Sequence, residues 1–123
     1  MICRLLTLVL ALAPTIAAAA EETAKESFAL RMLECAHKHK TFALGPGTAT
    51  AVAQADKEAL KYVTAAVKVT SAEFVEQRSP EIKSAAQKAV VKEFQSSQSV
   101  VEIKARWADT ISRCDAALIA PVE

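Results

Sequence analysis

The sequence contains no asparagine, only two glycines and a single tryptophan. Without asparagine the chain has no acceptor for N-linked glycosylation, whatever cell makes it. It also lacks the glycine-rich loop that cradles phosphates and the C-x-x-C-H sequence that attaches haem. These absences leave no motif for a cofactor, and we expect the protein to work without one.

An excess of positive charge is missing as well. The 123 residues carry 15 basic and 14 acidic side chains, with both signs interspersed along the chain. Proteins that bind nucleic acid or anionic membranes through their charge need a basic excess, at least on one face. We therefore expect no nucleic acid among the partners of this protein.

The chain begins with a short apolar segment of the kind that directs secretion. Arg4 is the only charged residue before Glu21, and residues 5–13 between them are almost all apolar. Ala18 and Ala20 form the A-x-A pattern that signal peptidase accepts. The alternative is an uncleaved membrane anchor. A span of the bilayer needs roughly 20 consecutive apolar residues, however, and the apolar run in this segment is shorter.

These features predict a cleavable signal peptide over residues 1–20, with cleavage after Ala20, and a single helical domain over residues 21–123. The expected location is the periplasm or the medium outside the cell, without stable membrane insertion after cleavage. Cleavage removes Arg4, so the mature domain has equal numbers of acidic and basic residues.

Two cysteines remain in the mature domain. Cys3 leaves with the signal peptide, whereas Cys35 and Cys114 stay near opposite ends of the domain. In an oxidising compartment such a pair is expected to form one disulfide. Closing a loop of about 80 residues would stabilise the fold by up to 4.5 kcal/mol in the chain-entropy model. The alternatives are two buried thiols or a redox pair, although no C-x-x-C is present.

Apolar residues recur with helical spacing along most of the chain. The first helix is predicted over about 22–43, and the turn Gly45-Pro46-Gly47 ends it. The second is predicted over about 49–69, with Thr48 or Thr50 as its cap. The expected buried faces are Phe28, Met32, Cys35, His39 and Phe42 in the first helix, and Val52, Ala55, Ala59 or Leu60, Val63 and Val67 in the second.

The second half of the mature chain has three start signals. Thr70 and Glu73 have the spacing of a capping box before a short piece that ends at Arg78. Ser79-Pro80 then predicts a new helix over about 80–95, and Ser99 caps the last helix. That helix has the clearest apolar stripe of the chain: Val100, Ile103, Trp107, Ile111, Cys114 and Leu118.

Short links between helices favour antiparallel neighbours. The sequence therefore predicts an all-α fold: a small bundle of four helices, or five if the short piece is separate, with one disulfide joining the first and last helices.

The stretch from Cys35 to Lys40 holds both histidines. Cys35 and His39 are four residues apart on one helical face, a spacing that suits two ligands of one metal ion. His37 and His39 are thus weak candidates for a metal site, although His37 points elsewhere and a disulfide would remove Cys35. Lys38 and Lys40 are weak candidates for a partner contact, or they complement the dipole of the helix. Protonation of the histidines below about pH 6.5 would make this surface more positive.

Trp107 has two interpretations. Flanked by Lys104, Arg106 and Asp109, it could anchor a partner. Its place in the apolar stripe of the last helix favours a role in the core instead.

No set of residues predicts catalysis, because the carboxylates are scattered beside lysines on what read as solvated helix surfaces. We expect a small exported, non-catalytic helical protein that binds another protein, one version of which is a stress-related chaperone. The alternative is a helical protein that binds a small ligand or a metal through the Cys35/His39 face.

Overall fold

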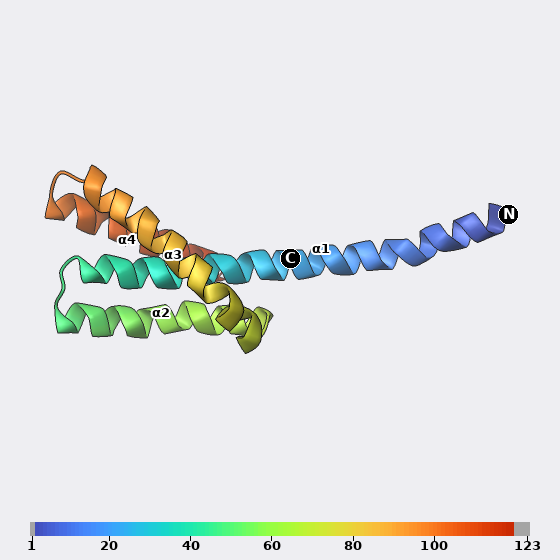
Figure 1. Ribbon diagram of the computed structural model, residues 1–123, viewed down its shortest axis with the longest axis horizontal. Helices are drawn as coiled ribbons and strands as arrows, with labels where there is room; N and C mark the ends of the chain where they lie inside the picture. The colour runs from blue at the N-terminus through green and yellow to red at the C-terminus, as the bar shows by residue number, and fades with distance from the viewer. Residues whose placement is uncertain (1, 120–123) are drawn as a thin grey trace.

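The computed structural model describes residues 2–119, with side chains from Thr23 to Ile119. Over these residues it contains four helices and no strand: α1 (Ile2–Leu44), α2 (Ala49–Val69), α3 (Ala72–Ser96) and α4 (Val100–Ile119). Helix α1 contacts the other three. The α1–α2 turn and the α3–α4 link lie at the same end of the bundle (Figure 1). The predicted small helical bundle is confirmed.

Helix α1 begins much earlier than its predicted start at about residue 22. It passes through the expected cleavage position after Ala20, and its first half extends beyond the other helices (Figure 1). The buried face of its second half agrees with the prediction: Met32, Cys35, His39 and Phe42 are buried, and Phe28 is half-buried against the core.

Alanine forms much of the contact core between α1 and α2. Ala29 and Ala36 of α1 and Ala59 and Ala66 of α2 are fully buried in one cluster. Small side chains let two helices approach closely, so that the backbones themselves come into contact. The predicted face of α2 is confirmed in part. Ala55 and Ala59 are buried as expected, and the other buried residues are Tyr62 and Ala66. Leu60, the alternative to Ala59, is 63% exposed.

The ends of α2 follow local chemistry. Gly47 has a φ of 68°, a left-handed conformation that glycine adopts freely, and it lets the chain turn after α1. The hydroxyl of Thr48 accepts a hydrogen bond from the amide of Ala51, which identifies Thr48 as the N-cap. At the other end Thr70 is the C-cap of α2, and Ser71 rather than Thr70 caps α3.

Helix α3 is continuous, so the predicted break before Ser79 is wrong. Pro80 lies inside the helix, and the expected short fifth helix is simply its first two turns. Ser79 does not serve as a cap, because its hydroxyl lies 2.8 Å from Nε2 of His37 on α1. That contact across the bundle joins α3 to α1 at the position where the sequence alone indicates a helix start.

A disulfide joins α1 to α4. Cys35 and Cys114 are bonded, with their Cα atoms 5.9 Å apart, and both are buried. This confirms the predicted pairing of the first and last helices. The bond places the middle of α4 against α1 and thereby positions the face described next.

Candidate functional site

The apolar stripe of α4 is only partly covered. We expected it to face the core, but Cys114 is the only buried residue of α4, all of which the structure describes. Val100, at the start of the stripe, is 66% exposed, and Trp107 and Ile111 are half-buried. The core role favoured for Trp107 is therefore met only in part, because the neighbouring helices cover this face of α4 incompletely.

Two adjoining hollows run along this face. One, of about 430 Å³, lies between the start of α4, the Gly45-Pro46 turn and Phe94 of α3. The other, of about 520 Å³, continues along α4 beside His39 as far as Asp115. Lys104 and Trp107 border both, so the hollows form one groove. We call it the α4 groove; its residues on α4 are Val100, Ile103, Lys104, Trp107, Ala108, Ile111, Ser112 and Asp115.

Trp107 lies between the groove and the core. Its ring is stacked on that of Phe42, with centroids 6.0 Å apart and planes 9° from parallel. Phe42 in turn meets Phe94 edge to face at 5.8 Å. Trp107 therefore combines the two roles considered for it, since it packs on core aromatics and also borders the groove.

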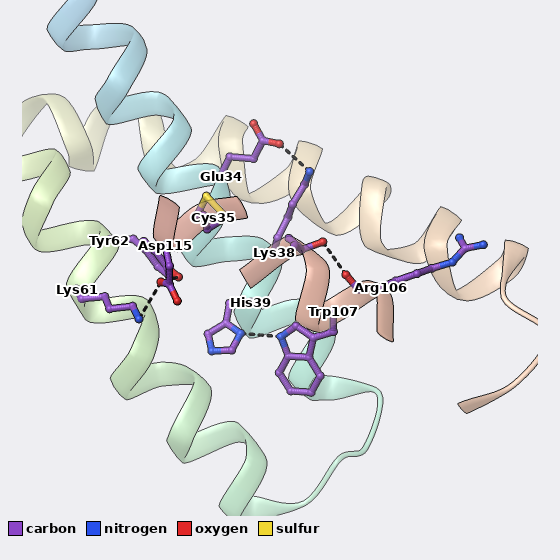
Figure 2. Close-up of a disulfide and its surroundings, with 11 residues drawn as sticks. Glu34, Cys35, Lys38, His39, Lys61, Tyr62, Arg106, Trp107 and Asp115 are labelled. Carbon is purple, nitrogen blue, oxygen red and sulfur yellow. Dashed lines mark hydrogen bonds and ion pairs between the residues drawn. A yellow bond between two sulfur atoms is a disulfide. The ribbon is translucent and has the colours of Figure 1, made fainter. Parts of the chain in front are cut away.

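His39 fixes the indole of Trp107 from the other side. The indole Nε1–H donates a 2.7 Å hydrogen bond to Nδ1 of His39 (Figure 2). Because an indole N–H can only donate, Nδ1 must be the unprotonated nitrogen, and the proton of the neutral ring is on Nε2. Nε2 is buried and has no hydrogen-bond partner among the described residues.

The surroundings of His39 favour its neutral form. The residue is only 8% exposed, and this burial lowers the pKa of the imidazole below its usual 6.5. The positive charge of Lys61 lowers the pKa further, whereas the carboxylates of Glu58 and Asp115 oppose the shift. Burial is the largest of these effects, so the ring is neutral at pH 7.

A charged cluster closes the far end of the groove. Lys61 Nζ lies 2.9 Å from Glu58 and 3.0 Å from Asp115, and its pKa is raised by its hydrogen bonds to both carboxylates. The hydroxyl of Tyr62 donates a 2.5 Å hydrogen bond to Asp115, which holds the pKa of that carboxyl below its usual range. Figure 2 shows Lys61, Tyr62 and Asp115 on the side of His39 away from Trp107. The cluster ties α2 to α4.

Of the three charged residues that flank Trp107, only Lys104 borders the groove. Arg106 forms ion pairs with acidic residues of α3 and α4, and Asp109 pairs with Arg113. Lys104 makes no ion pair with any residue between Thr23 and Ile119. The groove therefore has an uncompensated positive charge near its middle, with apolar side chains on either side.

The predicted metal candidates do not converge. His37 contacts Ser79, whereas His39 contacts Trp107. The sulfur of Cys35 is bonded to Cys114, so it is not available as a thiolate ligand. In the described part of the chain no three side chains of histidine, cysteine, aspartate or glutamate form a group that could hold a metal ion.

The lysines predicted as weak partner contacts lie away from the groove. Lys38 forms an ion pair with Glu34 at 2.7 Å, one turn earlier on α1. Lys40 is exposed. Neither residue borders the α4 groove.

A larger cleft, of about 620 Å³, lies over the disulfide between α1, α3 and α4. Its lining mixes the acidic side chains of Glu34 and Glu93 with three cations, two of which, Lys38 and Arg113, have acidic partners on their own helices; the third is Arg31. Such a surface has neither a consistent charge nor a continuous apolar area. We therefore regard the α4 groove as the better candidate for a binding site.

Sequence reasoning missed the contribution of α2 to this site. Tyr62 and Asp115 are 53 residues apart, and no local pattern links them. The one signal at position 62 is the tyrosine itself, next to Lys61, because a buried tyrosine hydroxyl usually finds a hydrogen-bond partner.

No protein-family model, curated protein or solved structure was found to match the chain. No helix in the described part of the chain combines the length and the apolarity needed to cross a bilayer.

Proposed function

We propose that this protein is an exported, non-catalytic helical module that binds another protein through the α4 groove. The observation that carries the proposal is the incomplete burial of the apolar stripe on α4. A continuous apolar surface that the fold leaves uncovered is typical of a binding site, and a half-buried tryptophan is a common anchor in such sites.

The proposed occupant is an amphipathic helix of the partner protein. The groove extends from Val100 to Asp115, a length of about 22 Å at the rise of an α-helix, which matches four turns of a docked helix. Its apolar borders would receive the apolar face of that helix. The unpaired Lys104 favours a partner with a glutamate or aspartate at the edge of that face.

Export is supported by the apolar leader and by the disulfide. Disulfides persist in the periplasm and outside the cell, whereas the cytosol keeps thiols reduced. The bond between Cys35 and Cys114 therefore fits the periplasmic or secreted location that residues 1–20 predict.

The test uses the oxidised mature protein and two synthetic helical peptides of about four turns. The peptides share one apolar face and differ in flanking residues, glutamate in one and lysine in the other. Fluorescence anisotropy of the labelled peptide should show saturable binding, tighter for the glutamate peptide. The variant Lys104→Glu should reverse this preference.

A matched pair of variants on α4 locates the binding surface. Ile103→Glu places a charge in the groove and should weaken binding at least tenfold. Val101→Glu changes a side chain that is 77% exposed and borders neither hollow, so it should leave the affinity unchanged. Equal effects of the two variants, or no binding of either peptide, would contradict the proposal.

A further inference from the structure

The hydrogen bond between Trp107 and His39 exists only while His39 is neutral. In the neutral ring Nδ1 accepts the indole N–H, at a distance of 2.7 Å. In the imidazolium both nitrogens carry protons and can only donate. Protonation would therefore place two N–H groups head to head, and the hydrogen bond between the two side chains would be lost.

We infer that His39 is a pH-operated latch on the α4 groove, which holds Trp107 in place when neutral and releases it when protonated. The latch is a property of the protein by itself. Its consequence for partner binding rests on the proposed function.

The groups that face His39 show where the protonated ring would turn. From α2 these are Glu58 and Lys61, and from α4 they are Trp107 and Asp115. The two carboxylates attract an imidazolium, and Lys61 repels it. Nε2–H, which has no partner in the neutral state, is the group that could reach a carboxylate. Acid would thus exchange a hydrogen bond to Trp107 for an ion pair on the side of α2.

Burial sets the pH range of this exchange. It holds the pKa of His39 below 6.5, so the latch is closed at neutral pH and opens only in solution more acidic than pH 6.5. The carboxylates of Glu58 and Asp115 have pKa values below their usual range, so they remain charged and able to receive the imidazolium there.

Release of Trp107 would change the groove as a whole. Its indole borders both hollows and covers Phe42. Without the hydrogen bond only packing, chiefly the stacking on Phe42, holds the indole in this position. When the indole moves, the groove loses the wall that its two halves share. We therefore expect a partner helix to bind at neutral pH and to dissociate on acidification.

The latch can be tested without any partner, because Trp107 is the only tryptophan of the chain. Its fluorescence emission should shift to longer wavelength as the pH falls from 7.5 to 4.5, with a midpoint below 6.5, while circular dichroism shows helicity retained. His39→Asn keeps an acceptor near Nδ1 but cannot titrate, so it should abolish the transition. His37→Asn, the matched control, should keep it.

A second measurement uses the unaltered protein, so that it does not depend on whether the variants fold. Nitrogen NMR of the imidazoles should show His39 as the Nε2–H tautomer at pH 7.5, and its titration should coincide with the fluorescence transition of Trp107. Titration of His39 without any change at Trp107 would overturn the latch. So would a transition that persists in His39→Asn.

The glutamate peptide separates this inference from the proposed function. Its affinity for the unaltered protein should fall up to tenfold per pH unit below the midpoint of the transition, and its affinity for His39→Asn should not. A Trp107 transition without peptide binding at any pH would support the latch and contradict the proposed function. Peptide binding that does not depend on pH, with no Trp107 transition, would support the proposed function and contradict the latch.

Discussion

The hydroxyl of Tyr62 on α2 donates a 2.5 Å hydrogen bond to the carboxylate of Asp115 on α4. Few contacts join these two helices, so this bond is part of what holds α4 in place. Tyr62→Phe removes the bond and leaves the ring. Because a hydrogen bond to a charged acceptor contributes about 1 to 2 kcal/mol, the free energy of unfolding in urea should fall by that amount. An unchanged free energy of unfolding would show that the bond is not structural.

Tyr62 is also the only tyrosine, so its ionisation can be followed by ultraviolet absorbance. Burial, assisted by the hydrogen bond to Asp115, raises the pKa of Tyr62 from its usual 10.0 to about 12. A raised pKa in the folded state contributes stability that is complete below pH 10 and is lost as the pH rises toward 12. Absorbance should give a midpoint near 12 for the folded protein and near 10 in urea. Coincident midpoints would be inconsistent with a buried phenol.

The disulfide should account for much of the stability. Cys35 and Cys114 are separated by 79 residues, and opening a loop of that size costs up to about 4.5 kcal/mol in the chain-entropy model. The double variant Cys35→Ser, Cys114→Ser should therefore unfold at much lower urea concentration. Hydrogen exchange should accelerate in α4 first, because α1 and α2 keep their own alanine-rich contact. If hydrogen exchange accelerated equally in all helices, the disulfide would not stabilise α4 in particular.

Acid should destabilise the protein in a range set by its histidines. The pKa values of His37 and His39 are both lowered, chiefly by burial. The unfolded chain then binds protons more readily than the folded one, so this stability is complete above about pH 6.5 and is lost as the pH falls through the folded-state pKa values. Urea unfolding at pH 7.5 and pH 5 should show the loss, and replacing either histidine by asparagine should reduce it. A stability independent of pH over this interval would contradict the assignment.

The sequence predicted the buried face of α1 better than that of α2, for physical reasons. The face of α1 was predicted because its large apolar residues repeat with helical spacing and all meet the core. On α2 the same reasoning was right for Ala55 and Ala59, which are buried, but missed Tyr62 and Ala66. Alanine is only weakly hydrophobic, and yet it fills the buried face of α2, whereas the strongly hydrophobic Leu60 is exposed. Helical spacing identifies an apolar face but does not show which of two neighbouring faces the partner helix covers.

The start of α3 shows a second limit. Ser79-Pro80 is a good local start signal, yet the helix continues through it, and Ser79 uses its hydroxyl to contact His37. Local capping preferences amount to about 1 kcal/mol, which a contact between distant segments can outweigh.

The candidate site was predicted only in part. The sequence placed Trp107, Lys104 and His39 on apolar or flanking positions and predicted the disulfide. The hydrogen bond from Trp107 to His39 joins residues 68 apart, which no spacing rule connects. The open groove was not predicted either, because periodicity shows that a face is apolar and not whether other helices cover it.

The central claim is that the apolar face of α4 is an open binding surface with Trp107 in its wall. The most direct measurement is an NMR titration of the oxidised protein, labelled at its methyl groups and at its indole nitrogen, with the glutamate peptide at pH 7.5. We predict saturable shifts for the indole of Trp107 and the methyl groups of Ile103 and Ile111, with little change at Leu60 and Val91, which are exposed on α2 and α3. Shifts centred on Leu60 or Val91, with the Trp107 indole unmoved, would contradict the claim.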